Sequence, residues 1–234
     1  MTNSLSKPKD SMERGGSRQV KRGERGNAMM EFGIVVPFIL LTLFGSVSLG
    51  VMLGRSVLVN QVCRDLAHMY VDGVDFTQVP NQNIVVQLAS GIGMTAAGGN
   101  GVVIFSRIMT VYQTDCDAAG YTATCGSLGQ CVITQRVYVG NQALRASNFG
   151  TPNSTLMNAS GNISSAVYLQ NTDSSVQTSG FAPLLIAAGE AGLIPQGNFV
   201  WVAETFYQAP DLAFLGNTFF NTSASGGSYA RFIF

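Results

Sequence analysis

The sequence predicts an α+β protein. A long N-terminal transmembrane helix should continue as an amphipathic helix, packed on a small antiparallel β-sheet domain. Three observations predict this class. An apolar run of 22 residues without a charge covers residues 32–53. Helical periodicity continues directly after that run. Later segments rich in β-branched and aromatic residues are separated by turn-forming residues, which is typical of strands in an antiparallel sheet.

The N-terminal segment differs from the rest of the chain in charge. Residues 1–26 hold seven Lys/Arg and three Asp/Glu, a balance of +4, whereas residues 27–234 hold six Arg and ten Asp/Glu, a balance of −4. A basic segment beside a membrane span stays in the cytoplasm and sets the orientation of the span. We therefore predict a basic cytoplasmic leader over residues 1–26, too polar to fold alone. This position disfavours a basic arm for nucleic acid, so no nucleic-acid partner is expected.

The apolar run predicts a membrane span. At about 1.5 Å per residue it extends about 33 Å, enough for a hydrocarbon core of about 30 Å. A secretory signal would have an apolar core of only about 7–15 residues. Beyond the run, Leu58, Val62, Leu66 and Tyr70 recur at four-residue steps. One helix is therefore expected over residues 27–72, with the polar His68 as a partly exposed packing residue.

Residues 73–234 are predicted to form one extracytoplasmic α+β domain. Its helices are expected at residues 84–92 and 181–191. A mostly irregular stretch covers residues 145–180, with a short strand at 166–170. The strands of the main sheet are expected at residues 102–113, 131–139, 199–207 and 229–234.

Four cysteines, Cys63, Cys116, Cys125 and Cys131, are candidates for disulfide formation. An extracytoplasmic domain permits disulfides. A metal site is disfavoured, because the only histidine is distant in sequence, and no cofactor is expected. Loop closure favours a pair among the last three cysteines, with the third free or bridged to Cys63. The sequence alone does not choose among these pairings.

Patterns that predict catalysis are nearly absent. No nucleophile is arranged with a base in a known spacing, so the chain is not expected to be an enzyme. Asp115 and Asp117 flank a cysteine, and we interpret them as solvated loop carboxylates rather than calcium ligands. Glu204 lies in an otherwise apolar strand, and of the two possibilities we favour a side chain that faces water over one that is buried and paired.

The most informative motif lies at the start of the membrane span. Gly26 and Asn27 are followed by Glu31 and Phe32, and Pro37 lies within the apolar run. A charge at the centre of a bilayer costs about 2.5–3.5 kcal/mol on insertion scales, and less near the membrane surface. Glu31 is therefore either a helix-start acid favoured by the helix dipole or a carboxylate kept for a partner charge.

This motif resembles the class III leader of type IV prepilins. The segment RGNAMMEFGIVVPFILLTLFG is most similar to TadE/TadG-like minor pilins of the tight-adherence system. The closing segments VAETFYQAP and SYARFIF resemble that family more loosely. The resemblance implies that a membrane peptidase cleaves between Gly26 and Asn27. Glu31 would then be the fifth residue of the mature chain and Pro37 the eleventh, and Glu31, Phe32 and Pro37 would serve pilin assembly.

The resemblance also implies a function. The chain is expected to be a minor pilin-like structural or assembly component of a Tad-type type IV pilus, supporting pilus biogenesis and surface adhesion. Its expected partners are the bacterial inner membrane, the prepilin peptidase, and other pilins or Tad assembly proteins. The N-terminus would be cytoplasmic, and the C-terminal domain periplasmic or on the extracellular fibre. The alternative is an uncleaved, membrane-tethered extracytoplasmic binding module that captures a ligand with its Ser/Thr/Asn-rich loops.

Overall fold

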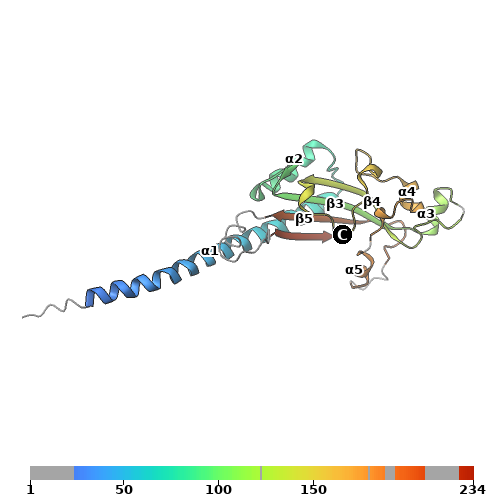
Figure 1. The fold of residues 1–234 in the computed structure, drawn as a ribbon. Helices are drawn as coiled ribbons and strands as arrows, with labels where there is room; N and C mark the ends of the chain where they lie inside the picture. Colours follow the sequence, from blue (N-terminus) through green and yellow to red (C-terminus); the bar gives the residue numbers. More distant parts are fainter. Residues whose placement is uncertain (1–23, 122, 179, 188–192, 209–226) are drawn as a thin grey trace, which may run out of the picture. The chain divides into compact units, whose positions relative to one another are not determined.

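The chain is an α+β protein with a long apolar N-terminal helix and a small antiparallel sheet, which confirms the predicted class (Figure 1). The computed structural model describes residues 24–234 except 122, 179, 188–192 and 209–226. The predicted leader therefore lies outside the described residues over 1–23. By its internal contacts the chain divides into two compact units, residues 1–47 and 48–234.

Helix α1 covers Glu24–Val71, so it begins three residues before its predicted start and ends one residue before its predicted end. Pro37 lies inside the helix. Proline has no backbone N–H, so the carbonyl of Gly33 loses its usual helical donor at this turn. The helix is followed by Gly73, whose φ of 87° lies in the left-handed region that favours glycine and ends the helical path.

Four strands form the main sheet in the order β4-β3-β5-β6, and every neighbouring pair is antiparallel. The bounds are Gly101–Thr110 for β3, Cys131–Gly140 for β4, Val200–Gln208 for β5 and Gly227–Ile233 for β6. A bulge in the β3–β4 pairing lies between Arg107 and Ile108. A separate two-stranded ribbon joins β1 (Met94–Thr95) to β2 (Gly98–Gly99). All four predicted strands of the main sheet are present, with ends shifted by up to three residues.

Two hydrophobic clusters involve opposite faces of the sheet. Successive strand residues point to alternate faces, so Val103 and Phe105 lie on one face and Ile108 on the other. The first cluster combines Phe105 and its neighbours with side chains of α1, among them Leu66 and Tyr70. In that cluster the Cys63 thiol donates to the Ala203 carbonyl at 3.3 Å. The second cluster lies on the opposite face and joins sheet residues to the following loops, with these buried members: Ile108, Cys131, Ile133, Phe149, Ile163, Val176, Phe181, Ile194 and Val202.

The remaining helices are short. α2 covers Val79–Leu88, α3 Gln113–Ala118, α4 Ser165–Gln170 and α5 Ala182–Ala187. Single 3-10 turns lie at η1 (Ser90–Ile92), η2 (Gln142–Leu144), η3 (Ser154–Leu156) and η4 (Ser174–Val176). α2 begins five residues before the predicted helix, with a proline in its first turn, where a missing N–H costs no helical bond.

One predicted strand is wrong. Residues 166–170 form α4 rather than a strand. In the described structure this segment contacts the edge strand β4 but does not pair with it as a strand. Leu169 is buried in a cluster with Val111 and Val132, so tertiary contacts override the weak strand preference. Asn171 ends the helix in the left-handed conformation, with φ 53°.

Candidate functional site

The predicted assembly residues lie on α1. Glu31 and Pro37 are exposed, and Phe32 is 68% exposed. Glu31 makes no hydrogen bond or ion pair within the part of the chain that the structure describes. Gly26 and Asn27 lie in the helical backbone of α1, and cleavage between them stays a prediction.

One helix, over residues Met29–Val71, is long and apolar enough to cross a membrane once. Large apolar side chains are exposed all along its first part, including Ile34, Phe38, Leu41 and Phe44. In a water-soluble helix apolar side chains gather on one stripe, whereas here they occupy every side. Orientation and the kind of membrane stay predictions.

Two of the four cysteines form a disulfide, and the other two are free thiols. Cys116, on α3, and Cys125 form a disulfide, while Cys63 and Cys131 are free and buried. This is one of the pairings that the sequence left open: a local bridge with the third loop cysteine free. The disulfide lies in a small cluster with Met109, Val111 and Leu169, so it links the excursion between β3 and β4 to the sheet.

The two loop carboxylates are held within α3. Asp115 accepts the backbone N–H of Tyr112 at 2.8 Å, and Asp117 accepts from the amide of Gln113 at 2.9 Å. Among the described residues, no three His, Cys, Asp or Glu side chains are close enough together to hold a metal ion.

Glu204 is buried, so the prediction that it faces water is wrong. It is 1% exposed and accepts three hydrogen bonds. The Ser147 hydroxyl donates to one carboxylate oxygen, and the Asn148 backbone N–H (3.0 Å) and the Tyr229 hydroxyl (2.7 Å) donate to the other. Burial, together with the charge of Glu204, raises the pKa of Tyr229 above its ordinary value.

A second buried charge, Arg136, shares that face of the sheet. Tyr138 of β4 is paired with Ile104 of β3, and Ile104 is paired with Glu204 of β5, so these three side chains project to one face of the sheet. Arg136 lies two residues before Tyr138 in β4, and its side chain therefore projects to that face as well. Arg136 is 1% exposed, and its Nη2 donates to the carbonyl of Gly150 at 3.0 Å. Its Nε and Nη1 have no hydrogen-bond partner within the described residues.

The electrostatic setting of Arg136 is unusual for an arginine. Burial lowers the pKa of its guanidinium, and Tyr138 and Glu204 oppose this effect. An unpaired buried donor costs about 1–3 kcal/mol, and more when it is charged. Arg136 is therefore not explained by stability alone.

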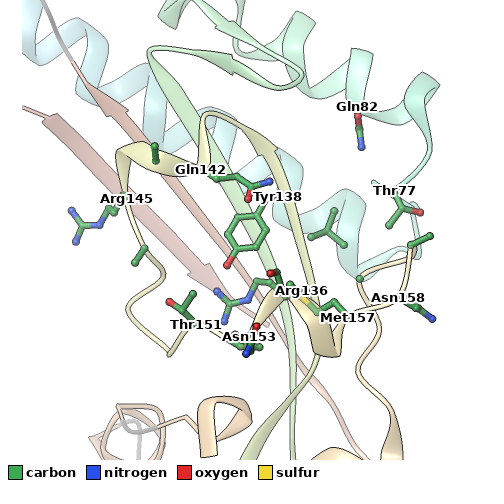
Figure 2. Close-up of a pocket in the computed structure, with 17 residues that line it drawn as sticks. Thr77, Gln82, Arg136, Tyr138, Gln142, Arg145, Thr151, Asn153, Met157 and Asn158 are labelled. Carbon is green, nitrogen blue, oxygen red and sulfur yellow. The ribbon is translucent and has the colours of Figure 1, made fainter. Parts of the chain in front are cut away.

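A cavity of about 770 Å³ lies next to Arg136. Figure 2 shows the guanidinium of Arg136 among Tyr138, Thr151 and Asn153. Arg145 also lines the cavity, but its guanidinium points away from Arg136, stacks over the ring of Tyr229 at 4.2 Å and donates to Asn148. Most of the other polar lining consists of amide and hydroxyl side chains: Thr77, Gln82, Gln142, Ser154 and Asn158.

Reasoning from the sequence missed both Arg136 and this cavity. Arg136 stands between Gln135 and Val137 in CVITQRVYV, and a charged residue in a strand ordinarily faces water. The segments that line the cavity come from three separate stretches, residues 77–82, 136–146 and 151–161. No local pattern in the sequence brings these stretches together.

Comparison with known proteins adds no relative: no family model matches the chain, and no curated protein and no solved structure matches it. The family resemblance therefore stays a prediction.

Proposed function

We propose that the chain is a minor pilin-like component of a Tad-type type IV pilus, inserted in the inner membrane and processed by a prepilin peptidase. The observation that carries the proposal is Glu31: an exposed carboxylate without a described partner, two turns into a helix whose following residues are apolar on all sides. Such a carboxylate is costly unless a cation meets it.

Leader removal would supply that cation. Cleavage after Gly26 creates a free amine on Asn27, one helical turn before Glu31, where side chains four apart are neighbours. The amine of an adjacent subunit offers the same charge. This pairing offsets the free-energy cost of placing the Glu31 carboxylate in the membrane. It also sets the register of neighbouring helices.

The proposed arrangement places the leader in the cytoplasm and the sheet domain outside. The second half of α1 packs on the sheet, which is supported by the buried cluster that Leu66 and Tyr70 share with Phe105. The disulfide between Cys116 and Cys125 agrees with an oxidising compartment.

The first test of this role is Glu31→Ala. The variant should insert in the membrane normally but be absent from sheared fibres, because the paired charge is lost. Asp65→Asn is the control, since Asp65 is an exposed acid in the same helix that pairs only with its neighbour Arg64 in the described structure. Normal incorporation of Glu31→Ala would refute the proposal.

A second test addresses processing. The intact mass and N-terminal sequence of the protein from its native membrane should show a chain that begins at Asn27. A chain that keeps residues 1–26 while the peptidase is active would contradict prepilin processing.

That second outcome favours another function, an uncleaved membrane-tethered binding module. The cavity beside the partly unpaired Arg136 supports this second candidate. Such a module requires neither the cut after Gly26 nor the carboxylate of Glu31.

A further inference from the structure

Two contacts between α1 and β5 show which end of the sheet is nearest to the apolar run. The Cζ of Arg55 lies 5.5 Å from the centroid of the Tyr207 ring, whereas Tyr70 packs edge-on against Trp201 with ring centroids 4.7 Å apart. Arg55 and Tyr70 are separated by about 22 Å of helix, and Trp201 and Tyr207 by about 20 Å of strand. The second part of α1 therefore runs along β5, and Tyr207 lies at the end that is nearest to the apolar run.

This end of the sheet lies at the level where the apolar run stops. The run ends at Leu53, only about 3 Å of helix before Arg55. Tyr207 is paired with Gly101, so the beginning of β3 lies at the same level. Residues 48–53 belong to the same compact unit as the sheet. Because lipid headgroups extend about 5–8 Å beyond each side of the hydrocarbon core, a bilayer that holds the apolar run brings its headgroups to this end of the sheet.

A charge-free segment covers this end of the sheet. Residues 76–106 contain no Asp, Glu, Lys, Arg or His, although much of the segment is exposed. The 3-10 turn η1 lies against α1, since a Cβ on Gly91 would meet the Leu58 side chain at 2.6 Å. The β1–β2 ribbon lies at the end of β4, where the N–H of Gly140 donates to the carbonyl of Ala96 at 2.9 Å.

The lack of charge sets this surface apart from an ordinary surface that faces water. Soluble domains average about one charged residue in four, so a segment of this length would ordinarily carry about eight. The exposed residues of the ribbon and its neighbours are small or neutral: Thr95, Ala96, Ala97 and Asn100. A charge pressed against a bilayer would lose water, which is costly, whereas neutral hydroxyl and amide groups exchange hydrogen bonds with lipid headgroups.

We infer that this end of the domain, formed by residues 91–101, rests in the headgroup layer of the bilayer that holds α1. The contact continues the surface that the apolar run presents to lipid, so its occupant is the bilayer itself. The inference rests on insertion of the apolar run, which both proposed functions share. It goes beyond them because it fixes how the domain stands on the membrane, with Trp201 at the end of the sheet that faces away from the bilayer.

Site-specific fluorescence of the full chain in phosphatidylcholine vesicles tests the inference. Single cysteines replace Ala97 in the ribbon, Ala166 in α4 or Leu41 in the apolar run, and each is labelled with a polarity-sensitive NBD dye. The native free cysteines are buried, so the unsubstituted chain measures background labelling. Nitroxides on the lipid headgroups quench dyes at the membrane surface, and nitroxides on the acyl chains quench dyes in the core.

Ala166 provides the matched control for Ala97, because both are exposed alanines of the same domain. Leu169 of the same helix packs with Val111, beyond the far end of β3. Headgroup nitroxides should quench the dye at residue 97 at least about threefold more strongly than the dye at residue 166, which lies about 30 Å further along the sheet. Acyl-chain nitroxides should quench the dye at residue 41, which checks that α1 is inserted.

A spacer variant tests whether α1 sets the height of the domain. Seven helix-forming residues that include charges, inserted after Leu53, add two helical turns and raise the domain by about 10 Å. Quenching at residue 97 should then fall to the level at residue 166, while quenching at residue 41 is kept. Circular dichroism checks that the variant is folded.

Four results would overturn the inference. Equal quenching at residues 97 and 166, with residue 41 quenched, would remove the contact but leave membrane insertion intact. A dye at residue 41 that is not quenched would refute insertion itself, and with it the anchor that both proposed functions share. A blue-shifted dye at residue 97 that headgroup nitroxides do not quench would assign the surface to a second copy of the chain. Unchanged quenching at residue 97 in the spacer variant would show that α1 does not set the contact.

Discussion

The two faces of the main sheet are both covered, but by different chemistry. One face meets α1 through apolar and aromatic groups, and Phe105 stacks on Phe76 with ring centroids 4.2 Å apart. The opposite face holds two buried charges, Arg136 and Glu204, next to residues 147–150. The first face needs only complementary shape, whereas the second needs a hydrogen-bond partner for each polar atom.

The largest effect is expected on the face that meets α1. Phe105→Ala should lower the free energy of unfolding by about 3–5 kcal/mol, because it opens a cavity between Phe76 and Tyr70. Denaturant unfolding of the full chain in detergent measures the loss. A loss below about 1 kcal/mol would show that this face of the sheet contributes little to stability.

Substitutions on the face with the buried charges should lower the free energy of unfolding by a smaller amount. Glu204→Gln should destabilise the fold by about 1–3 kcal/mol, because the new amide group presents a donor to Ser147, Asn148 or Tyr229 where an acceptor is required. Arg231→Gln is the control at the exposed cross-strand partner of Glu204 and should change stability by less than about 0.5 kcal/mol. Equal effects of the two substitutions would mean that burial of Glu204 has no energetic consequence.

Tyr229 should make the polar face sensitive to alkaline pH. Its pKa in the folded state is raised by burial and by the charge of Glu204. The stabilisation from the neutral hydroxyl is thus complete below the ordinary tyrosine pKa of about 10 and is lost as pH rises through the higher folded pKa. Tyr229→Phe should cost about 1 kcal/mol at neutral pH.

Thermal unfolding from pH 8 to pH 12 checks this sign. The difference in stability between the native chain and Tyr229→Phe should shrink as pH rises above about 10. A difference that grows with pH would contradict the assignment of Tyr229 as a donor to Glu204.

The smallest effect on stability is expected at Arg136. Arg136→Met removes an incompletely paired buried charge and keeps an unbranched side chain, so stability should change by less than about 1 kcal/mol. Chemical denaturation of the full chain provides the measurement, with Arg231→Met as the reference. A loss of more than about 3 kcal/mol would mean that Arg136 is kept for stability.

Much of the apolar framework was predictable from local pattern. The four-residue steps from Leu58 to Tyr70 indicated the buried stripe of α1, and β-branched runs indicated β3, β4 and β5. These predictions hold because one face of an element is buried whatever covers it. α4 was predicted wrongly because a segment of six residues follows its tertiary neighbours rather than its own propensity.

Local sequence patterns were enough to predict the apolar span, the helix that continues it, the strands of the sheet and the candidate cysteines. Composition and periodicity along the chain carry that information. The three-dimensional structure was needed to show which cysteines pair, that Glu204 is buried, and that Arg136 lies beside a cavity. These features depend on loops such as residues 147–154, which reach the sheet from distant positions, and alternation within a strand does not indicate whether such a loop covers its polar face.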